Sequence, residues 1–161
     1  SRDDGKTWTE HQRIAEEFNE TSLLYLGEEN WLAAARPVDK NGMGLFRSTD
    51  NGATWAFECR LSLPMQHPGH LLRLSDGRII FSCGLRNPGS HGVSVRLSED
   101  EGHTWGPAFP LGFYHRPADG GYPSSSQRAD GVIVTAYYCA QTPSHERYHM
   151  GVVLWRPDEI V

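Results

Sequence analysis

The sequence has little that would support a metal site, a disulfide framework or a membrane segment. Its three cysteines (Cys59, Cys83 and Cys139) are spread along the chain, and an odd number cannot all pair within it. None of the eight histidines forms a pair at the spacing of metal ligands within one element, so we expect no metal and no cofactor. No apolar run is long enough to cross a membrane.

A surplus of one charge is also missing. The 15 Lys and Arg residues and the 20 Asp and Glu residues give a net charge of −5, and both signs are scattered along the chain. We therefore expect neither a nucleic-acid surface nor a polybasic membrane anchor. Glycine and proline, by contrast, are frequent, with 17 and 10 residues, and the many turns that they indicate favour an all-β fold.

One motif of eight residues occurs three times, beginning at Ser1, Ser48 and Ser98. It reads S-x-D-x-G-x-T-W, and its Asp residues are 47 and then 50 residues apart. Five fixed positions in three copies make a chance match untenable, so we treat the motif as a true repeat. Its Asp, Gly and Trp positions are Asp3, Gly5, Trp8, Asp50, Gly52, Trp55, Asp100, Gly102 and Trp105.

Each fixed position of this motif has a mechanical explanation. The Asp carboxylate can accept hydrogen bonds from backbone N–H groups of its own turn, and Gly tolerates the positive φ of a chain reversal. The large flat Trp side chain can pack beneath the hairpin. We therefore interpret the motif as structural and its Asp residues as non-catalytic.

Short apolar or β-branched runs lie between the motifs. Trp31–Ala35, Arg78–Cys83 and Val132–Tyr138 are predicted strands, and Met43–Ser48 and Gly92–Ser98 are predicted strands that lead into the second and third motifs. Strands that recur every ~50 residues are typical of four-stranded propeller blades.

These observations predict an all-β chain that forms part of a β-propeller. Three blades are too few to close a ring, so we expect a six-bladed propeller of which this chain is the C-terminal half. The start at Ser1, inside a motif and without Met, leads us to expect further chain before it. Segment Thr9–Phe18 has no clean apolar stripe and is not expected to be a helix. The predicted units are 1–12 (the end of a blade), 13–62, 63–112 and 113–161 (the terminal blade).

Two arginines occupy the same position in successive blades. Arg36 and Arg86 each lie 14 residues before a motif Asp, at the end of the second strand of a blade. That strand end lies at the rim opposite the motif, where two converging guanidinium groups would bind a carboxylate. The alternative is two surface arginines at strand ends. Arg96 could compete with Arg86, but it lies in the strand that enters the motif, further from this rim, so we favour Arg86.

Two further segments complete the pattern, Asn19–Leu23 with the sequence N-E-T-S-L and Gly121–Ser125 with the sequence G-Y-P-S-S. With the repeated motif they make the chain resemble the sialidase (neuraminidase) superfamily of Asp-box, or BNR-repeat, β-propellers. In that family a Glu in an N-E-[ST] strand is followed by a strand that ends in Arg, then by an Arg of a later blade, and then by a Tyr in a G-Y-S strand. The matching residues, in the same order, are Glu20, Arg36, Arg86 and Tyr122.

The resemblance implies an exo-glycoside hydrolase that removes terminal sialic acid from glycans with retention of configuration. Arg36 and Arg86 would bind the substrate carboxylate, and Glu20 would accept the proton of the nucleophile Tyr122. A neutral Tyr is not repelled by the substrate carboxylate, and sialidases are the known exception to the two-carboxylate rule. The resemblance also places a third Arg and an Asp acid/base upstream. It implies a secreted, periplasmic or lysosomal setting and a glycan as the partner.

Two other functions stay open. The reading Tyr-Pro-Ser at Tyr122, instead of Tyr-Ser, leaves room for a related Asp-box glycosidase that acts on another glycan. The boxes alone also fit a non-catalytic propeller that binds glycans or proteins. Further side chains that could reach a sugar are Tyr138 at a strand end and four histidines in or near predicted loops of the active rim, His67, His70, His91 and His115.

Overall fold

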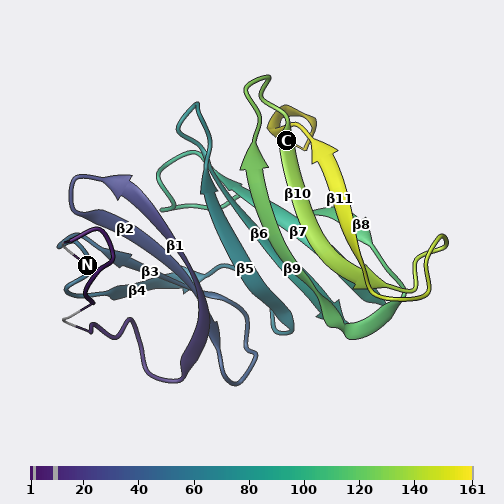
Figure 1. Cartoon of the computed structure of the whole chain (residues 1–161), viewed down its shortest axis with the longest axis horizontal. Coiled ribbons are helices and arrows are strands. Elements are labelled where there is room, and N and C mark those ends of the chain that lie inside the picture. Colours follow the sequence, from purple (N-terminus) through teal and green to yellow (C-terminus); the bar gives the residue numbers. More distant parts are fainter. Residues whose placement is uncertain (2, 9–10, 161) are drawn as a thin grey trace.

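A computed structural model describes residues 1, 3–8 and 11–160 of the chain, with only the backbone of 116–118. These residues form three antiparallel sheets that follow one another along the chain and stand side by side (Figure 1). The first sheet contains β1 (Phe18–Gly27), β2 (Asn30–Pro37), β3 (Gly44–Ser48) and β4 (Ala56–Arg60). The second contains β5 (Gln66–Arg73), β6 (Ile79–Asn87), β7 (Ser90–Ser98) and β8 (Phe109–Phe113), and the third β9 (Arg116–Gln127), β10 (Ile133–Ala140) and β11 (His149–Trp155).

Within each sheet, neighbours in the chain are neighbours in space, in the order β1-β2-β3-β4, β5-β6-β7-β8 and β9-β10-β11. This is the meander of a propeller blade, and the prediction of an all-β propeller is confirmed. The strands predicted before the second and third boxes correspond to β3 and β7, and the predicted second strands of the blades correspond to β2, β6 and β10. Among the described residues, no helix is long and apolar enough to span a membrane.

Apolar side chains fill the space between successive sheets. Strand β5 contacts both β1 and β9, so the first strands of the three sheets lie next to one another. The cluster between the first and second sheets contains Leu32, Ala34, Met43, Leu45, Leu61, Leu71, Ile79, Phe81 and Cys83. The cluster between the second and third sheets contains Leu74, Ile80, Val95, Ile133 and Trp155. Burial of these side chains fixes the sheets against each other.

The Asp-box turns are closed by their own hydrogen bonds. In the second box, Asp50 accepts bonds from the backbone N–H of Thr54 at 2.8 Å and from its hydroxyl at 2.6 Å. The Ser48 hydroxyl donates to the same carboxylate at 2.8 Å, and the Trp55 indole N–H donates to the Gly52 carbonyl at 3.1 Å. The first and third boxes repeat this set. Each box is therefore a self-contained turn.

The first box differs from the others in the packing of its Trp. Trp55 and Trp105 pack against apolar clusters, whereas Trp8 is 75% exposed. The expected packing beneath a hairpin thus occurs at two of the three boxes. In the segment that follows, Thr9 and Glu10 lie outside the described residues, and residues 11–17 contain no helix, as expected.

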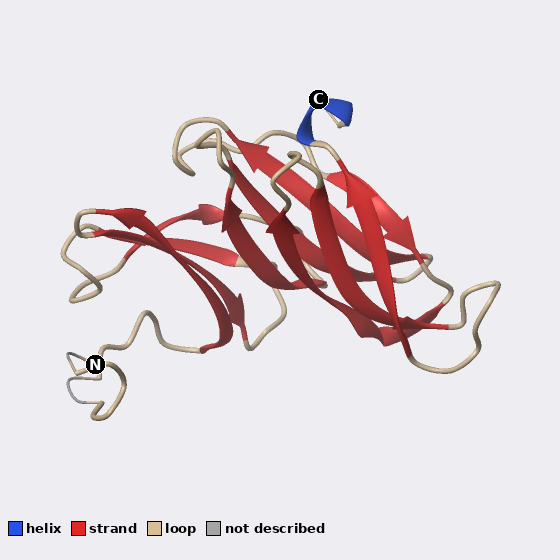
Figure 2. Ribbon diagram, turned by 45° about the horizontal axis from the view of Figure 1, so that its top comes forward, coloured by secondary structure: helices blue, strands red, loops and turns tan. Residues whose placement is uncertain are grey.

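The strands run between two rims of the molecule. Trp31 pairs with Ser48, so the second box lies where β2 begins, while Arg36 lies near the other end of β2. The second sheet repeats this, with Ile79 opposite Ser98 and Arg86 opposite His91. Arg36 lies five residues after Trp31, and Arg86 lies seven residues after Ile79, which are distances of roughly 16 and 23 Å along a strand. Figure 2 shows the strands between these two sets of loops, with the helical turn η1 (Pro157–Glu159) at the C-terminal end. We name them the box rim and the site rim.

Candidate active site

Each of the three first strands contains a bulge at the site rim. In each case two residues of the first strand lie opposite a single residue of the second strand. The bulged pairs and the residues opposite them are Asn19-Glu20 and Arg36, His67-Pro68 and Gly84, and Tyr122-Pro123 and Tyr137. A bulge bends its strand and redirects a side chain. Repeated in three adjacent strands, it turns Glu20, His67 and Tyr122 toward one region.

Close contact between two backbones brings the second and third sheets together at this point. A Cβ atom on Gly121 would lie only 2.7 Å from the Cα of Gly84, so glycine is required there. Tyr122, the next residue, has a φ of 49°, an uncommon value for a residue with a side chain. The Arg86 guanidinium carbon lies 5.4 Å from the centroid of the Tyr122 ring. The strained turn thus places the phenol beside Arg86.

Glu20 joins two of the predicted residues. The Tyr122 hydroxyl donates to Glu20 Oε1 at 2.6 Å, and Arg36 Nη1 donates to Glu20 Oε2 at 2.6 Å. Arg36 Nη1 also lies 3.5 Å from the Tyr122 hydroxyl oxygen. The four residues that the sequence selected therefore lie together, although up to 102 positions separate the bonded partners.

The environment of Glu20 and Tyr122 shifts their pKa values in opposite directions. Partial burial pushes the pKa of Glu20 upward, but hydrogen bonds from Tyr122 and Arg36 outweigh it, and the pKa is lowered. The hydrogen bond to Glu20, with partial burial, raises the pKa of Tyr122 above that of an ordinary phenol. At neutral pH the pair is therefore a neutral phenol that donates to a carboxylate, the starting arrangement for general-base activation.

A second carboxylate, Asp119, lies beyond Arg86. Its Oδ1 is 3.9 Å from Arg86 Nη2 and accepts a 2.5 Å hydrogen bond from the Tyr138 hydroxyl. Burial, followed by this hydrogen bond, raises the pKa of Tyr138. The Tyr138 ring stacks on that of Tyr122, with centroids 5.5 Å apart. Asp119 was not predicted from the sequence; its place three residues before Tyr122, in the same glycine-rich segment, is the signal that could have revealed it.

Arg96 has a different environment. Its guanidinium donates to the backbone carbonyls of Gly106 at 2.7 Å, Leu61 at 2.9 Å and Trp105 at 2.9 Å. These bonds tie the third box to the end of the first sheet. Arg96 is thus used within the scaffold, and the structure does not bring it to Tyr122.

One of the four histidines lies differently from the prediction. His67 and His91 are each the second residue of their strands, β5 and β7, and so lie next to a loop as expected, whereas His70 lies in the middle of β5. His70 accepts a hydrogen bond at Nδ1 from the backbone N–H of Ser125 at 3.3 Å, which links two sheets. His67 is 1% exposed, because the bulge turns it inward. His115 lies in a loop and is exposed.

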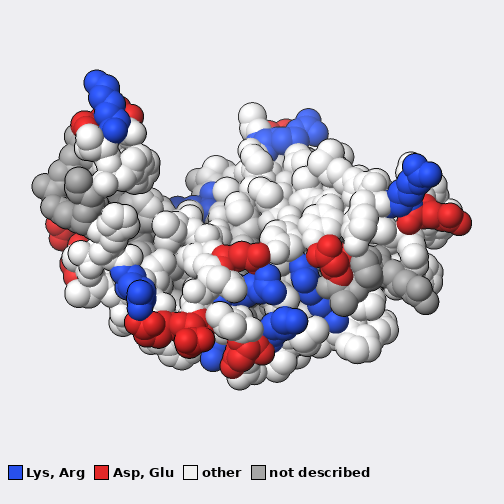
Figure 3. Space-filling model, turned by 60° about the horizontal axis from the view of Figure 1, so that its bottom comes forward, with Lys and Arg blue, Asp and Glu red and all other residues white. Residues whose placement is uncertain are grey.

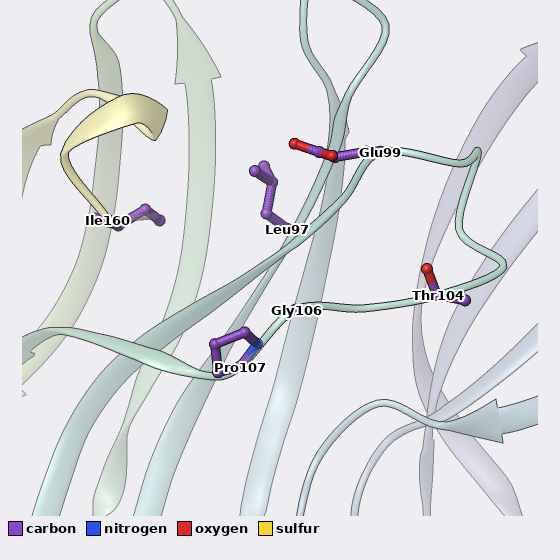
Figure 4. A pocket seen from close by; sticks show the side chains of 6 residues that line it. All are labelled: Leu97, Glu99, Thr104, Gly106, Pro107 and Ile160. Carbon is purple, nitrogen blue, oxygen red and sulfur yellow. The ribbon is translucent and has the colours of Figure 1, made fainter.

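The two rims offer different surfaces to a ligand. A cavity of about 320 Å³ at the box rim is lined by Leu97, Glu99, Thr104, Gly106, Pro107 and Ile160 (Figure 4). Among the described residues that line it there is one carboxylate and no basic side chain. Figure 3, turned so that the lower edge of Figure 1 comes forward, shows acidic and basic side chains gathered across the middle of that face. Within the described ranges there is no group of three or more His, Cys, Asp or Glu that could hold a metal ion.

Several solved structures have a similar fold. A protein of unknown function from Dyadobacter fermentans is 28% identical, over 96% of this chain and 43% of its own, with a TM-score of 0.76. A GH93 alpha-L-arabinofuranosidase of Fusarium graminearum is 18% identical over 94% of this chain and 51% of its own, with a TM-score of 0.67. A mutant Trypanosoma rangeli sialidase displaying trans-sialidase activity is 17% identical over 99% of this chain and 26% of its own, with a TM-score of 0.66.

The chain thus spans about half or less of the length of these structures. No curated protein sequence matches it. The model of the BNR repeat-like domain matches residues 1–137, which include all three boxes and the site residues from Glu20 to Tyr122. The chain therefore belongs to the family of BNR repeat-like domains.

Proposed function

We propose that the propeller to which this chain contributes is an exo-acting glycoside hydrolase of sialidase type. The observation that carries the proposal is the 2.6 Å hydrogen bond from the Tyr122 hydroxyl to Glu20, with Arg36 and Arg86 beside it. A nucleophile in contact with a base, flanked by two guanidinium groups, suits a substrate that carries a carboxylate next to its reacting carbon. A protein that only binds glycans has no need of the Glu–Tyr pair.

The reaction would divide between these residues as follows. Arg36 and Arg86 hold the sugar carboxylate and so orient the ring. Tyr122 attacks the anomeric carbon while Glu20 accepts the phenolic proton, and the glycosidic bond to the leaving oxygen breaks. The proton for the leaving oxygen comes, by the family resemblance, from an Asp of an earlier blade. Water then hydrolyses the glycosyl–tyrosine bond, and the two inversions give retention.

The full-length protein tests this proposal with a fluorogenic sialoside. We expect release of the fluorophore by the wild-type protein and its loss in Tyr122→Phe, with an unchanged Tm because the hydroxyl lies in the exposed part of the site. A wild-type protein that is inert on all glycosides, but whose glycan binding is weakened by Arg36→Ala, would make the propeller a binding module and overturn the hydrolase proposal.

A second substrate class is favoured by a specific observation. The arabinofuranosidase resembles this chain as closely as the sialidase does, with TM-scores of 0.67 and 0.66. An α-L-arabinofuranoside carries no carboxylate, so its hydrolysis should not depend on Arg86. Parallel assays with a sialoside and an arabinofuranoside, on the wild-type protein and on Arg86→Ala, separate the two substrates.

A further inference from the structure

Buried polar atoms without a hydrogen-bond partner gather in one place. Among the described side chains they belong to Arg36, His67, Arg86 and Tyr114. Arg36 and Arg86 border Tyr122, as described above. The Tyr114 hydroxyl would lie 3.7 Å from a Cβ on Gly121, the residue before Tyr122. Native proteins rarely leave buried polar groups unsatisfied, so their concentration around one site indicates a ligand that supplies the partners.

The proposed reaction uses neither His67 nor Tyr114 of this group, and His67 is the more deeply buried of the two. It is 1% exposed, and neither Nδ1 nor Nε2 has a partner. It occupies the bulge of β5, the strand between those that carry Glu20 and Tyr122, and its carbonyl oxygen would lie 2.8 Å from a Cβ on Gly84. Arg36, Arg86 and Glu20 lie near enough for their charges to shift the pKa of its ring, so His67 borders the site at the middle of the three bulges.

The atoms without partners indicate which kind of ligand would bind here. Arg36 Nε, Arg86 Nε and Arg86 Nη2 can only donate hydrogen bonds. Burial and the positive charges of Arg36, Arg86 and Lys40, opposed by Glu20, lower the pKa of His67 to about 4. The imidazole is then neutral above pH 5 and offers one N–H donor and one acceptor. With this N–H, the three arginine atoms give four donors at the site, which match an oxygen-rich anion.

We propose that His67 is a third substrate-binding residue, whose ring N–H donates to the carboxylated sugar that Arg36 and Arg86 bind. This inference rests on the proposed function for the carboxylate. It assigns this role to the middle one of the three bulged strands, which lies between the strand of the general base and that of the nucleophile. The second ring nitrogen accepts a hydrogen bond from a hydroxyl of the same sugar.

The test is binding of small sugars to the full-length protein, measured by calorimetry. The probes are free N-acetylneuraminic acid, glucuronic acid and the neutral carboxamide of N-acetylneuraminic acid. His67→Phe keeps a ring of similar size without nitrogen atoms, and His67→Asn keeps a short hydrogen-bonding side chain. We expect His67→Phe to weaken binding of the acid that the wild-type protein prefers by about tenfold or more. His67→Asn should retain part of this affinity, and the carboxamide should be affected least.

His70→Phe is the matched control, because His70 lies in the same strand but bonds to the backbone of Ser125. It should leave the affinity for the acid unchanged. The wild-type protein provides a second readout without any substitution. In nitrogen-detected NMR of the histidines, the acid should bring out a slowly exchanging ring N–H of His67 and raise its pKa, since a bound carboxylate opposes the two arginines.

The outcomes separate this inference from the proposed function. If the wild-type protein binds none of the three probes, both proposals are overturned. If the wild-type protein binds an acid and Arg36→Ala abolishes this binding, but His67→Phe binds the acid as tightly as the wild-type protein does, only the role of His67 is overturned. Should His67→Phe fail to fold, an unchanged His67 ring signal in the saturated wild-type protein overturns that role by itself.

Discussion

The two rims of the molecule use carboxylates in opposite ways. At the box rim, Asp50 receives its hydrogen bonds from Thr54 and Ser48, at most four positions away in the chain. At the site rim, Glu20 receives them from Arg36 and Tyr122, 16 and 102 positions away. The first carboxylate is satisfied by its own turn before any sheets assemble. The second is satisfied only when the sheets that carry Glu20 and Tyr122 are both in place.

The same contrast holds for unsatisfied groups. All buried side-chain polar atoms without partners, within the part of the chain that the structure describes, lie around the site rim. Such groups lower stability, and their concentration at one rim is expected of a surface that is complementary to a ligand. Substitutions at the box rim should therefore change stability, and those at the site rim should change activity.

After the loss of the nucleophile in Tyr122→Phe, the largest effect should come from Glu20→Gln. The amide keeps the size of the side chain but cannot accept the phenolic proton, so kcat/KM on the substrate of the full-length protein should fall by roughly 10² to 10⁴-fold. Asp100→Asn makes the same chemical change in the third box and is the control. It should lower the Tm by several degrees and leave kcat/KM unchanged well below that temperature. Equal losses of activity in the two variants would contradict the division between the rims.

The next effect separates two arginines of neighbouring strands, Arg86 in β6 and Arg96 in β7. Arg86→Lys removes the planar fork that binds a carboxylate in two places, so KM for a carboxylated substrate should rise by about 10 to 100-fold. Arg96→Lys removes bonds to backbone carbonyls and should lower the Tm with little change in KM. Steady-state kinetics and thermal unfolding of both variants provide the comparison. If KM rose more in Arg96→Lys than in Arg86→Lys, Arg96 would be the substrate-binding residue and Arg86 the structural one.

The pH dependence of stability should also report on the box rim. Hydrogen bonds from the Thr54 side chain, its backbone and Ser48 lower the pKa of Asp50 to about 2, below the ordinary value of 3.8. A lowered folded-state pKa stabilises the fold above the ordinary value, and this contribution is lost as the pH falls from about 4 toward 2. Asp50→Asn should therefore make the fall of Tm over this range shallower. An unchanged slope in the variant would show that the carboxylate is not held in this way.

The sequence predicted the boxes and the shared position of Arg36 and Arg86, because both depend on a repeat that can be counted along the chain. It could not predict the bulges, since an extra residue in a strand changes no composition and little periodicity. The burial of His67 could not be predicted for this reason. The bulges also account for Pro123, the departure from the family pattern. Like Pro68 in β5, Pro123 is the second residue of its bulge, where the ladder is interrupted and a missing N–H is tolerated.

The smallest predicted effect sharpens the assignment of the nucleophile. Tyr122 and Tyr138 are stacked tyrosines, and each donates a hydrogen bond to a carboxylate, Glu20 in one case and Asp119 in the other. Tyr138→Phe keeps the stacking and removes one bond to a carboxylate that is 64% exposed, so kcat/KM should change by less than about threefold. Removal of the phenolic oxygen of Tyr122 in Tyr122→Phe should, by contrast, abolish activity. If Tyr138→Phe were as damaging, Asp119 and Tyr138 would be the reacting pair, and Glu20 would serve to hold Arg36.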